Sequence, residues 1–205
     1  YRSFVSGSVI ETTSKVAELC KLSENSFRDV NIAFANELSM ICETVGVDVW
    51  ELISLANRHP RVNILKPGVG VGGHCIAVDP WFIVSSAPES SKLIKTAREV
   101  NDSKPEWVIN QVKQEMSRFS GKPKIVCLGL SFKPDIDDLR ESPALYVVDN
   151  LLGLGFDVSV VEPNITKLDN YDNMELDSAI NTSDLIVVLV GHKEFLTDAI
   201  RHRLL

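Results

Sequence analysis

The sequence predicts an α + α/β fold: an all-helical half over residues 1–120, then an α/β half over residues 121–205 built on a parallel sheet. In the first half, apolar residues recur at helical spacing over a long stretch. In the second half, short β-branched runs alternate with a helical segment, which is the pattern of parallel βαβ units. Gly121-Lys122-Pro123 separates the two patterns, so we place the domain boundary there.

A long helix is predicted over residues 14–45. Thr12, Thr13 and Ser14 are candidate N-caps, and Gly46 is a suitable terminator. A helix of this length usually buries one stripe in its own domain and a second stripe against a partner. Its apolar positions follow near-heptad spacing: Val16, Cys20, Phe27, Val30, Phe34, Leu38, Ile41 and Val45.

Shorter elements complete the first half. Residues 48–56 are expected to form a helix, and residues 57–79 are rich in glycine and proline and predict a loop. Two further helices are predicted, over residues 91–101 and from Ser103 to about residue 119. Pro105 suits the first turn of the second of these, because proline lacks the amide hydrogen that a first turn leaves unbonded.

The second half reads strand, helix, strand, strand. The strands are predicted over residues 124–130, 156–161 and 184–190, and Ser142-Pro143 begins a helix that ends near Gly153. A doubly wound sheet normally holds more strands, so we expect the chain to be cut at both ends.

Composition excludes several classes of protein. The 205 residues carry a net charge of −7, which disfavours nucleic-acid binding through phosphates. The longest aliphatic run, residues 185–190, is too short to cross a bilayer, and no signal peptide is evident. The four cysteines form no Cys-x-x-Cys pair, which argues against a metal site and for free thiols in the cytoplasm. Three of them fall within predicted helices or strands, where buried structural cysteines are common: Cys20, Cys42 and Cys127.

Cys75 stands apart from the other cysteines because glycines precede it and Asp79 follows it. Glycines let a backbone approach a ligand closely, so this loop can present the thiol to a substrate; a buried structural thiol is the alternative. Gly68-x-Gly70-x-x-Gly73 matches the dinucleotide fingerprint, but Pro67 precedes it and no helix or acidic residue follows at the required distance, so we reject that match. His74 could serve a thiol hydrolase as base, although neighbours on an extended segment point to opposite sides.

Two groups of polar residues can support chemistry at this thiol. Lys21 and Asn25 share one face of the long helix and could stabilise a developing oxyanion, or they could simply be solvated. Asp79 could act as a base or as a turn residue before proline. Lys133 and Arg140 follow the first strand of the parallel sheet, where cations suit phosphates; surface salt bridges are the alternative.

Together these residues resemble the UDP-glucose/GDP-mannose dehydrogenase family, the nucleotide-sugar 6-dehydrogenases. The matching strings cover residues 17–25, 72–80 and 131–142. Residues 33–37, 57–63 and 74–82 look most like the branch that acts on UDP-N-acetylmannosamine.

The resemblance implies oxidation of a sugar C6 alcohol to a carboxylate, with two NAD molecules reduced, in the synthesis of cell-surface polysaccharides. Cys75 would form a thiohemiacetal and then a thioester that water releases. Lys21 would steady the oxyanion, Asn25 would hold the sugar or a water, and Asp79 would assist proton transfer.

The resemblance also implies a Rossmann-like UDP-sugar-binding domain in the second half and a homodimer through the long helix 14–45. Arg140 would contact the cofactor, and Arg61 would reach into the neighbouring subunit's site. The substrate-binding residues would be Arg61, Asn63, Gly72, Gly73, His74 and Lys133.

Two departures from the family pattern matter. The NAD-binding domain that precedes these segments in the family is absent from the sequence, so we expect this chain alone not to turn over substrate. Val78 also stands where the UDP-glucose branch carries a lysine that contacts the cofactor. Two other functions remain open: a non-catalytic module that dimerises and binds a nucleotide sugar, and a cysteine hydrolase that uses His74.

Overall fold

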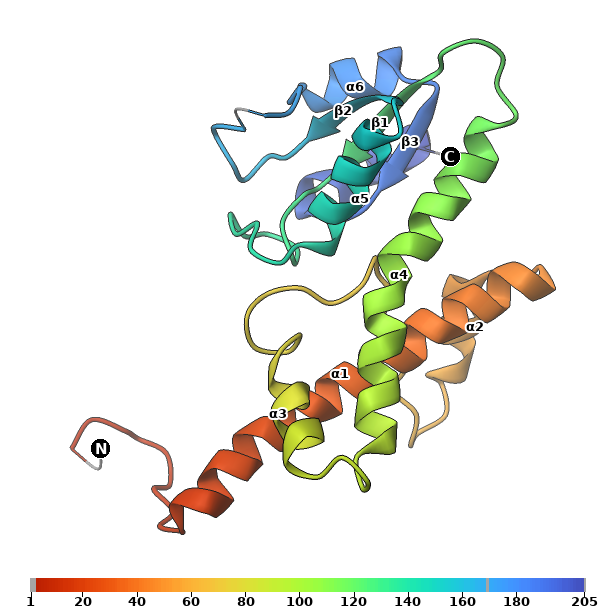
Figure 1. The fold of residues 1–205 in the computed structure, drawn as a ribbon. Helices are drawn as coiled ribbons and strands as arrows, with labels where there is room; N and C mark the ends of the chain where they lie inside the picture. The colour runs from red at the N-terminus through yellow and green to blue at the C-terminus, as the bar shows by residue number, and fades with distance from the viewer. Residues whose placement is uncertain (1–2, 169, 205) are drawn as a thin grey trace.

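Two long helices cross in the first half of the chain, and a parallel sheet lies beside the far end of the second helix (Figure 1). The computed structural model describes residues 3–168 and 170–204; residues 1 and 205, the outer limits of the two predicted domains, lie outside that part. The two long helices are α1 (Ser14–Val45) and α4 (Lys92–Met116). A helical half followed by a parallel α/β half confirms the predicted fold class.

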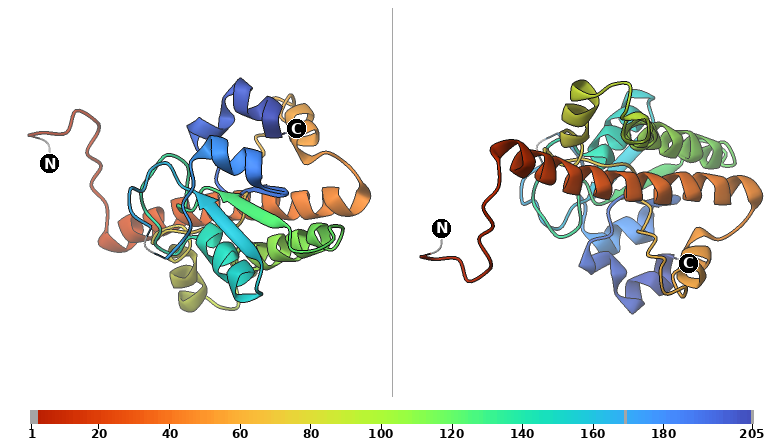
Figure 2. Two further views of the ribbon diagram at one scale, coloured as in Figure 1. Left: turned by 90° about the horizontal axis from the view of Figure 1, so that it is seen from above. Right: turned by 90° about the horizontal axis from the view of Figure 1, so that it is seen from below.

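Local signals determine both ends of α1, which spans the width of the molecule in Figure 2. The Thr13 hydroxyl accepts a hydrogen bond from the Val16 amide, and Gly46 ends the helix in the left-handed conformation at φ 72°. Asp48 then caps α2 (Val49–Ala56) by accepting hydrogen bonds from two amides of its first turn.

The inward face of α1 is mainly polar, and its apolar stripe points outward. The buried residues include Asn25, Asp29 and Asn36. Cys20 is exposed, so the prediction that it is a buried structural thiol is wrong, whereas Cys42 and Cys127 are buried. The large apolar side chains that α1 exposes are Val16, Leu19, Phe27, Phe34, Ile41 and Val45.

A buried ion pair joins α1 to α4. Arg98 is 1% exposed, and its guanidinium donates to the Asp29 carboxylate at 2.6 Å and also to Asp102. Burial raises the pKa of Asp29, and the nearby Arg98 charge opposes that rise. Asn101 donates to the same Asp29 oxygen at 2.9 Å, which adds a neutral partner to the pair.

The polar contact continues from the ion pair to the glycine loop. The Asn36 amide group donates to the Asn101 side chain at 2.9 Å, and its oxygen accepts from the Gly68 amide at 2.8 Å. The network therefore fixes the point at which the loop carrying Cys75 leaves the helices.

The helix α4 is one continuous helix, so the prediction of two separate helices over residues 91–101 and 103–119 is wrong. Pro105 lies inside it, and tertiary packing compensates for the lost backbone hydrogen bond. The side chain of Lys104 is buried, donates to Ser39 at 2.7 Å and lies 3.6 Å from the centre of the Trp107 ring. Burial lowers the pKa of Lys104 to about 8.

One helix was not predicted in the region of the glycine loop. α3 (Asp79–Ser86) begins directly after that loop, with Pro80 in its first turn. Its eight residues span little more than two turns, which is too short for a periodic apolar pattern to distinguish it from a loop.

The sheet has three parallel strands in the order β2-β1-β3. These are β1 (Lys124–Leu128), β2 (Asp157–Val161) and β3 (Leu185–Val188), so all three predicted strands exist but each is shorter than predicted. Gly129 directly follows β1 and adopts the left-handed conformation, at φ 84°. Glycine suits this position because a side chain there would also collide with Val190.

Helices cover both faces of the sheet. On one face, Ile125 and Cys127 pack against α5 (Pro143–Gly153) and the second half of α4. On the other, Val126 and Leu128 pack against α6 (Leu176–Thr182) and the 3-10 helix η1 (Lys193–Leu196). The sequence did not predict α6, η1 or α7 (Asp198–Leu204).

Glycines allow the loop before Cys75 to pack directly on the second half. A Cβ added at Gly72 would lie 2.2 Å from the Glu141 carbonyl oxygen and 2.7 Å from Pro143. One added at Gly73, at φ 78°, would lie 2.8 Å from the Phe132 ring. The two halves therefore meet at the backbone of Gly72 and Gly73, where no side chain keeps them apart.

Replacing Arg98 with alanine should lower the free energy of unfolding by about 3–5 kcal/mol, because it leaves the Asp29 carboxylate buried without its charged partner. Urea denaturation measures this loss. Lys95→Ala is the matched control on the same helix; it removes an exposed 3.8 Å pair with Glu99 and should cost less than about 1 kcal/mol. Equal losses in the two variants would contradict the structural role given to the buried pair.

Gly72→Ala should destabilise the protein by about 1–3 kcal/mol, because the new methyl group must displace the Glu141 backbone. Amide hydrogen exchange should rise over residues 131–143. Gly68→Ala, in the same loop but with nothing within 4 Å of the added atom, is the control and should change stability by less than about 0.5 kcal/mol. The close contact is refuted if Gly72→Ala behaves like this control.

Candidate functional site

Cys75 lies in a tight turn that leads into α3, and its side chain is exposed. The Cys75 carbonyl accepts hydrogen bonds from the amides of Val78 at 3.1 Å and Asp79 at 2.8 Å. Because this hydrogen-bonded turn runs directly into α3, the backbone fixes Cys75 relative to Asp79.

Asn25 and Asp79 form the contact that links the long helix to this turn. The Asn25 side-chain amide donates to the Asp79 carboxylate at 2.5 Å, across 54 residues of sequence. Asn25 is buried and Asp79 is half-buried, so Asn25 holds one carboxylate oxygen while the group stays partly accessible to solvent. The structure thus brings together two of the four predicted catalytic residues by direct contact.

Lys21 lies one turn before Asn25 on α1 and is exposed. Its ammonium group lies 3.5 Å from Glu24, with both side chains well exposed. An exposed pair of this kind holds its partners weakly, so the ammonium group can turn toward a ligand at little cost.

His74 contacts the thiol, which corrects the expectation that the two side chains point to opposite sides. Its Nδ1 lies 3.0 Å from the Cys75 Sγ. The argument from an extended segment fails because residues 73–78 bend and turn. An imidazole at this distance can accept the thiol proton.

Lys133 and Arg140 lie in the segment after β1, which packs against the glycine loop. Both are exposed, and the Lys133 ammonium lies 5.8 Å from the centre of the Phe132 ring. Arg140 donates to both Asp138 oxygens, through Nε at 3.0 Å and through a terminal nitrogen at 2.7 Å. These bonds hold the pKa of Asp138 at about 2.

Arg61 and Asn63 are exposed and lie in the segment that follows α2. That segment and α3, which begins four residues after Cys75, lie on opposite sides of α4 in Figure 1. The twenty residues from Asn25 to Val45 span about 30 Å of helix. The segment that carries Arg61 and Asn63 is thus separate from α3 in a single copy of the chain.

Two buried residues at the same edge of the sheet were missed by the sequence reasoning. Glu162 directly follows β2, and His192 follows β3 by four residues; both are buried. A carboxylate placed directly after a strand was the signal that could have identified the first of them.

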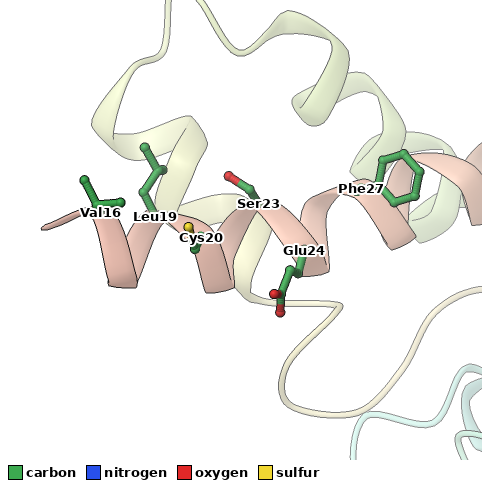
Figure 3. A pocket seen from close by; sticks show the side chains of 6 residues that line it. All are labelled: Val16, Leu19, Cys20, Ser23, Glu24 and Phe27. Carbon is green, nitrogen blue, oxygen red and sulfur yellow. The ribbon is translucent and has the colours of Figure 1, made fainter. Parts of the chain in front are cut away.

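An open apolar hollow lies on the outward face of α1 rather than over Cys75 (Figure 3). Its lining comes from successive turns of one helix, so the hollow is part of the exposed stripe described above. The residues are Val16, Leu19, Cys20, Ser23, Glu24 and Phe27.

The described residues, 3–168 and 170–204, hold neither a helix that could cross a bilayer nor a cluster of metal ligands. No helix there has both the length and the apolar character needed to cross a bilayer. The same residues contain no group of three or more His, Cys, Asp or Glu side chains placed to hold a metal ion.

Comparison with known proteins finds close relatives over nearly the whole chain. It is 59% identical over 201 residues to the NDP-N-acetyl-D-galactosaminuronic acid dehydrogenase of Ralstonia nicotianae, which covers 95% of this chain and 47% of the relative. It is 58% identical over 204 residues to the UDP-N-acetyl-D-mannosamine dehydrogenase of Campylobacter jejuni, with 96% and 50% covered. The chain thus spans about half the length of the curated relatives it matches.

A solved structure shows the same fold. The UDP-N-acetyl-mannosamine dehydrogenase of S. aureus superposes with a TM-score of 0.84 at 44% identity, covering 97% of this chain and 48% of that one. Residues 15–103 match the central domain of the UDP-glucose/GDP-mannose dehydrogenase family, and residues 126–204 match the UDP binding domain of that family. The chain belongs to the UDP-glucose/GDP-mannose dehydrogenase family.

Proposed function

We propose that this chain is part of an NAD-dependent UDP-sugar 6-dehydrogenase that oxidises the C6 alcohol of UDP-N-acetylmannosamine to a carboxylate. The observation that carries the proposal is the exposed Cys75 thiol, held beside His74 and one turn before an Asp79 that Asn25 fixes in place. The names of its relatives, both dehydrogenases of nucleotide-linked N-acetylated sugars, support the substrate class.

The thiol acts as the nucleophile toward the C6 aldehyde. His74 accepts the thiol proton, and the sulfur electron pair forms the bond to the aldehyde carbon while the carbonyl pair moves to oxygen. Lys21, whose ammonium is exposed on the same face of α1 as Asn25, stabilises that oxyanion.

Removal of the C6 hydride from the thiohemiacetal, which the NAD implied by the family would accept, would leave a thioester. Its hydrolysis uses Asn25 and Asp79. Water attacks the thioester carbon, Asp79 accepts its proton, and the thiolate leaves. The hydrogen bond from Asn25 orients the Asp79 carboxylate. These steps explain why the site needs a carboxylate fixed near the thiol.

NAD is the hydride acceptor that the family resemblance implies. Arg140 suits a phosphate of this cofactor because its guanidinium is exposed beside the glycine loop, although Asp138 now holds it. The glycine-rich segment 68–73 forms a loop, not the strand–turn–helix cradle of a dinucleotide site. The described residues thus supply one edge of a cofactor site.

The described residues contain no strand–turn–helix cradle at the glycine-rich segment, and this also supports a second candidate function. That function is a non-catalytic module that dimerises and binds a UDP-sugar. Such a module would need Lys133 at the UDP phosphates but would not need a reactive Cys75. The reactivity of that thiol separates the two functions.

Dimerisation through α1 is supported by its exposed stripe. Phe27 is 71% exposed and Phe34 is 55% exposed, seven residues apart on the same face. Heptad spacing of large apolar residues is typical of helices that pack against a second helix. A dimer of this kind would also offer Arg61, which is exposed in the segment after α2, to the site of the second copy.

Cys75→Ser should lower UDP-N-acetylmannosamine oxidation by about 1000-fold or more, because the nucleophile is replaced by a far weaker one. NADH formation is measured on the longest form of the protein that its gene encodes. Cys20→Ser is the matched control, since Cys20 is also exposed but lies outside the site.

An unchanged rate in Cys75→Ser contradicts the mechanism. Wild-type protein that oxidises none of the UDP-linked N-acetylhexosamines contradicts the function. Alkylation of Cys75 that is no faster than that of Cys20, and that UDP-sugar does not slow, favours the non-catalytic module.

Phe34→Glu should raise the dimer dissociation constant at least about 30-fold, because it places a charge at the centre of the proposed apolar contact. Sedimentation velocity over a range of concentrations measures this shift. Leu154→Glu, a 54% exposed position at the end of α5, is the control and should leave the dimer intact. A wild-type protein that sediments as a monomer, or a Phe34→Glu variant that still dimerises, rules out the helical interface.

A further inference from the structure

A buried polar cluster lies at the carboxyl edge of the sheet, beneath the segment that carries Lys133. His192 is 0% exposed and Glu162 is 3% exposed. Neither side chain can touch a substrate directly, so any contribution to function must act through the residues they hold.

Glu162 organises the backbone that leaves β1. One carboxylate oxygen accepts from the Leu130 amide at 2.7 Å, from the Ser131 amide at 3.2 Å and from His192 Nε2 at 3.1 Å. The other accepts from the Asn164 amide at 3.0 Å. Burial by itself would raise the pKa of Glu162, but these hydrogen bonds outweigh it and lower that pKa, so the group is an ionised acceptor.

His192 holds the next part of the same segment. Its Nδ1 lies 2.9 Å from the Asp135 amide, which can only donate a hydrogen bond. Nδ1 must therefore carry the lone pair, and Nε2 carries the proton that it donates to Glu162. Asp135 has φ 62°, a conformation that a non-glycine residue keeps only when its surroundings fix it.

The segment between these anchors carries the two side chains that matter. Lys133 lies in its middle, and its carbonyl accepts from the Ser131 hydroxyl at 2.8 Å. Phe132 packs against Gly73, two residues before Cys75. A shift of residues 130–135 would move the proposed phosphate contact and the support of the thiol loop together.

Glu162 also occupies a position that dinucleotide-binding sheets use differently. In those proteins an acidic residue after the second strand binds the hydroxyl groups of a ribose. Here the carboxylate faces inward and is saturated by four protein donors. It serves the loop rather than the nucleotide.

We propose that His192, acting through Glu162 and the Asp135 amide, is a positioning residue that holds residues 130–135 so that Lys133 meets the UDP diphosphate and Phe132 supports the Cys75 loop. The proposal rests on the proposed UDP-sugar function. It assigns a role in nucleotide binding to a side chain that never contacts the nucleotide.

The test compares His192→Ala with Val147→Ala, a core truncation in α5 that leaves the cluster intact. Calorimetric titration with UDP should show at least about tenfold weaker binding in His192→Ala and unchanged binding in Val147→Ala, since misplacing a binding group by about 1 Å is enough for such a loss. Amide hydrogen exchange over residues 130–141 should rise in the first variant only. His192→Asn, whose side-chain oxygen can still accept from the Asp135 amide, should recover part of the affinity.

The outcomes separate this proposal from the function on which it rests. Wild-type protein that binds no UDP contradicts the proposed function, and hydrogen exchange then decides by itself whether His192 holds the segment. Wild-type protein that binds UDP, with His192→Ala binding equally well, overturns the positioning role. Equal losses of affinity in Val147→Ala, or exchange over residues 130–141 that does not change in His192→Ala, overturn it as well.

Discussion

The buried ion pair between Asp29 and Arg98 is the interaction on which the rest of the structure depends. It lies where α1 crosses α4, and charges buried at 0% and 1% exposure are tolerated only when they are paired and hydrogen-bonded. Asn101 and Asn36 extend that pairing to the Gly68 amide. The same contacts that lock the crossing angle of the helices therefore fix the start of the loop that presents Cys75.

The second constraint is the absence of side chains at Gly72 and Gly73. Because the loop backbone lies directly on Phe132 and Glu141, the position of the thiol depends on the segment after β1 as well as on the helices. That segment is in turn held from beneath by Glu162 and His192. The thiol loop is thus held from both sides, by one polar network in the helical half and by another in the α/β half.

The face that α1 turns inward is mainly polar, so this long helix does not form a conventional apolar core with α4. Its polar residues form the network with α4, while phenylalanine and aliphatic side chains remain at the surface. Exposed apolar stripes of this kind are typical of interaction surfaces. The helical half therefore buries its polar contacts and exposes the apolar stripe of α1.

The sequence by itself determined the elements whose signals are local, and the tertiary structure decided the contacts between distant residues. Helix ends such as Thr13 and Gly46, and the three strands, follow from capping, backbone freedom and short apolar runs, all of which act over a few residues. The sequence could not show that α4 continues through Pro105, that the polar face of α1 turns inward, or that Glu162 pairs with His192. Those outcomes depend on burial and on partners some 30 to 70 residues apart, for which no local pattern exists. The contact between His74 and Cys75 was missed because residues 73–78 bend and turn, whereas an extended segment was assumed.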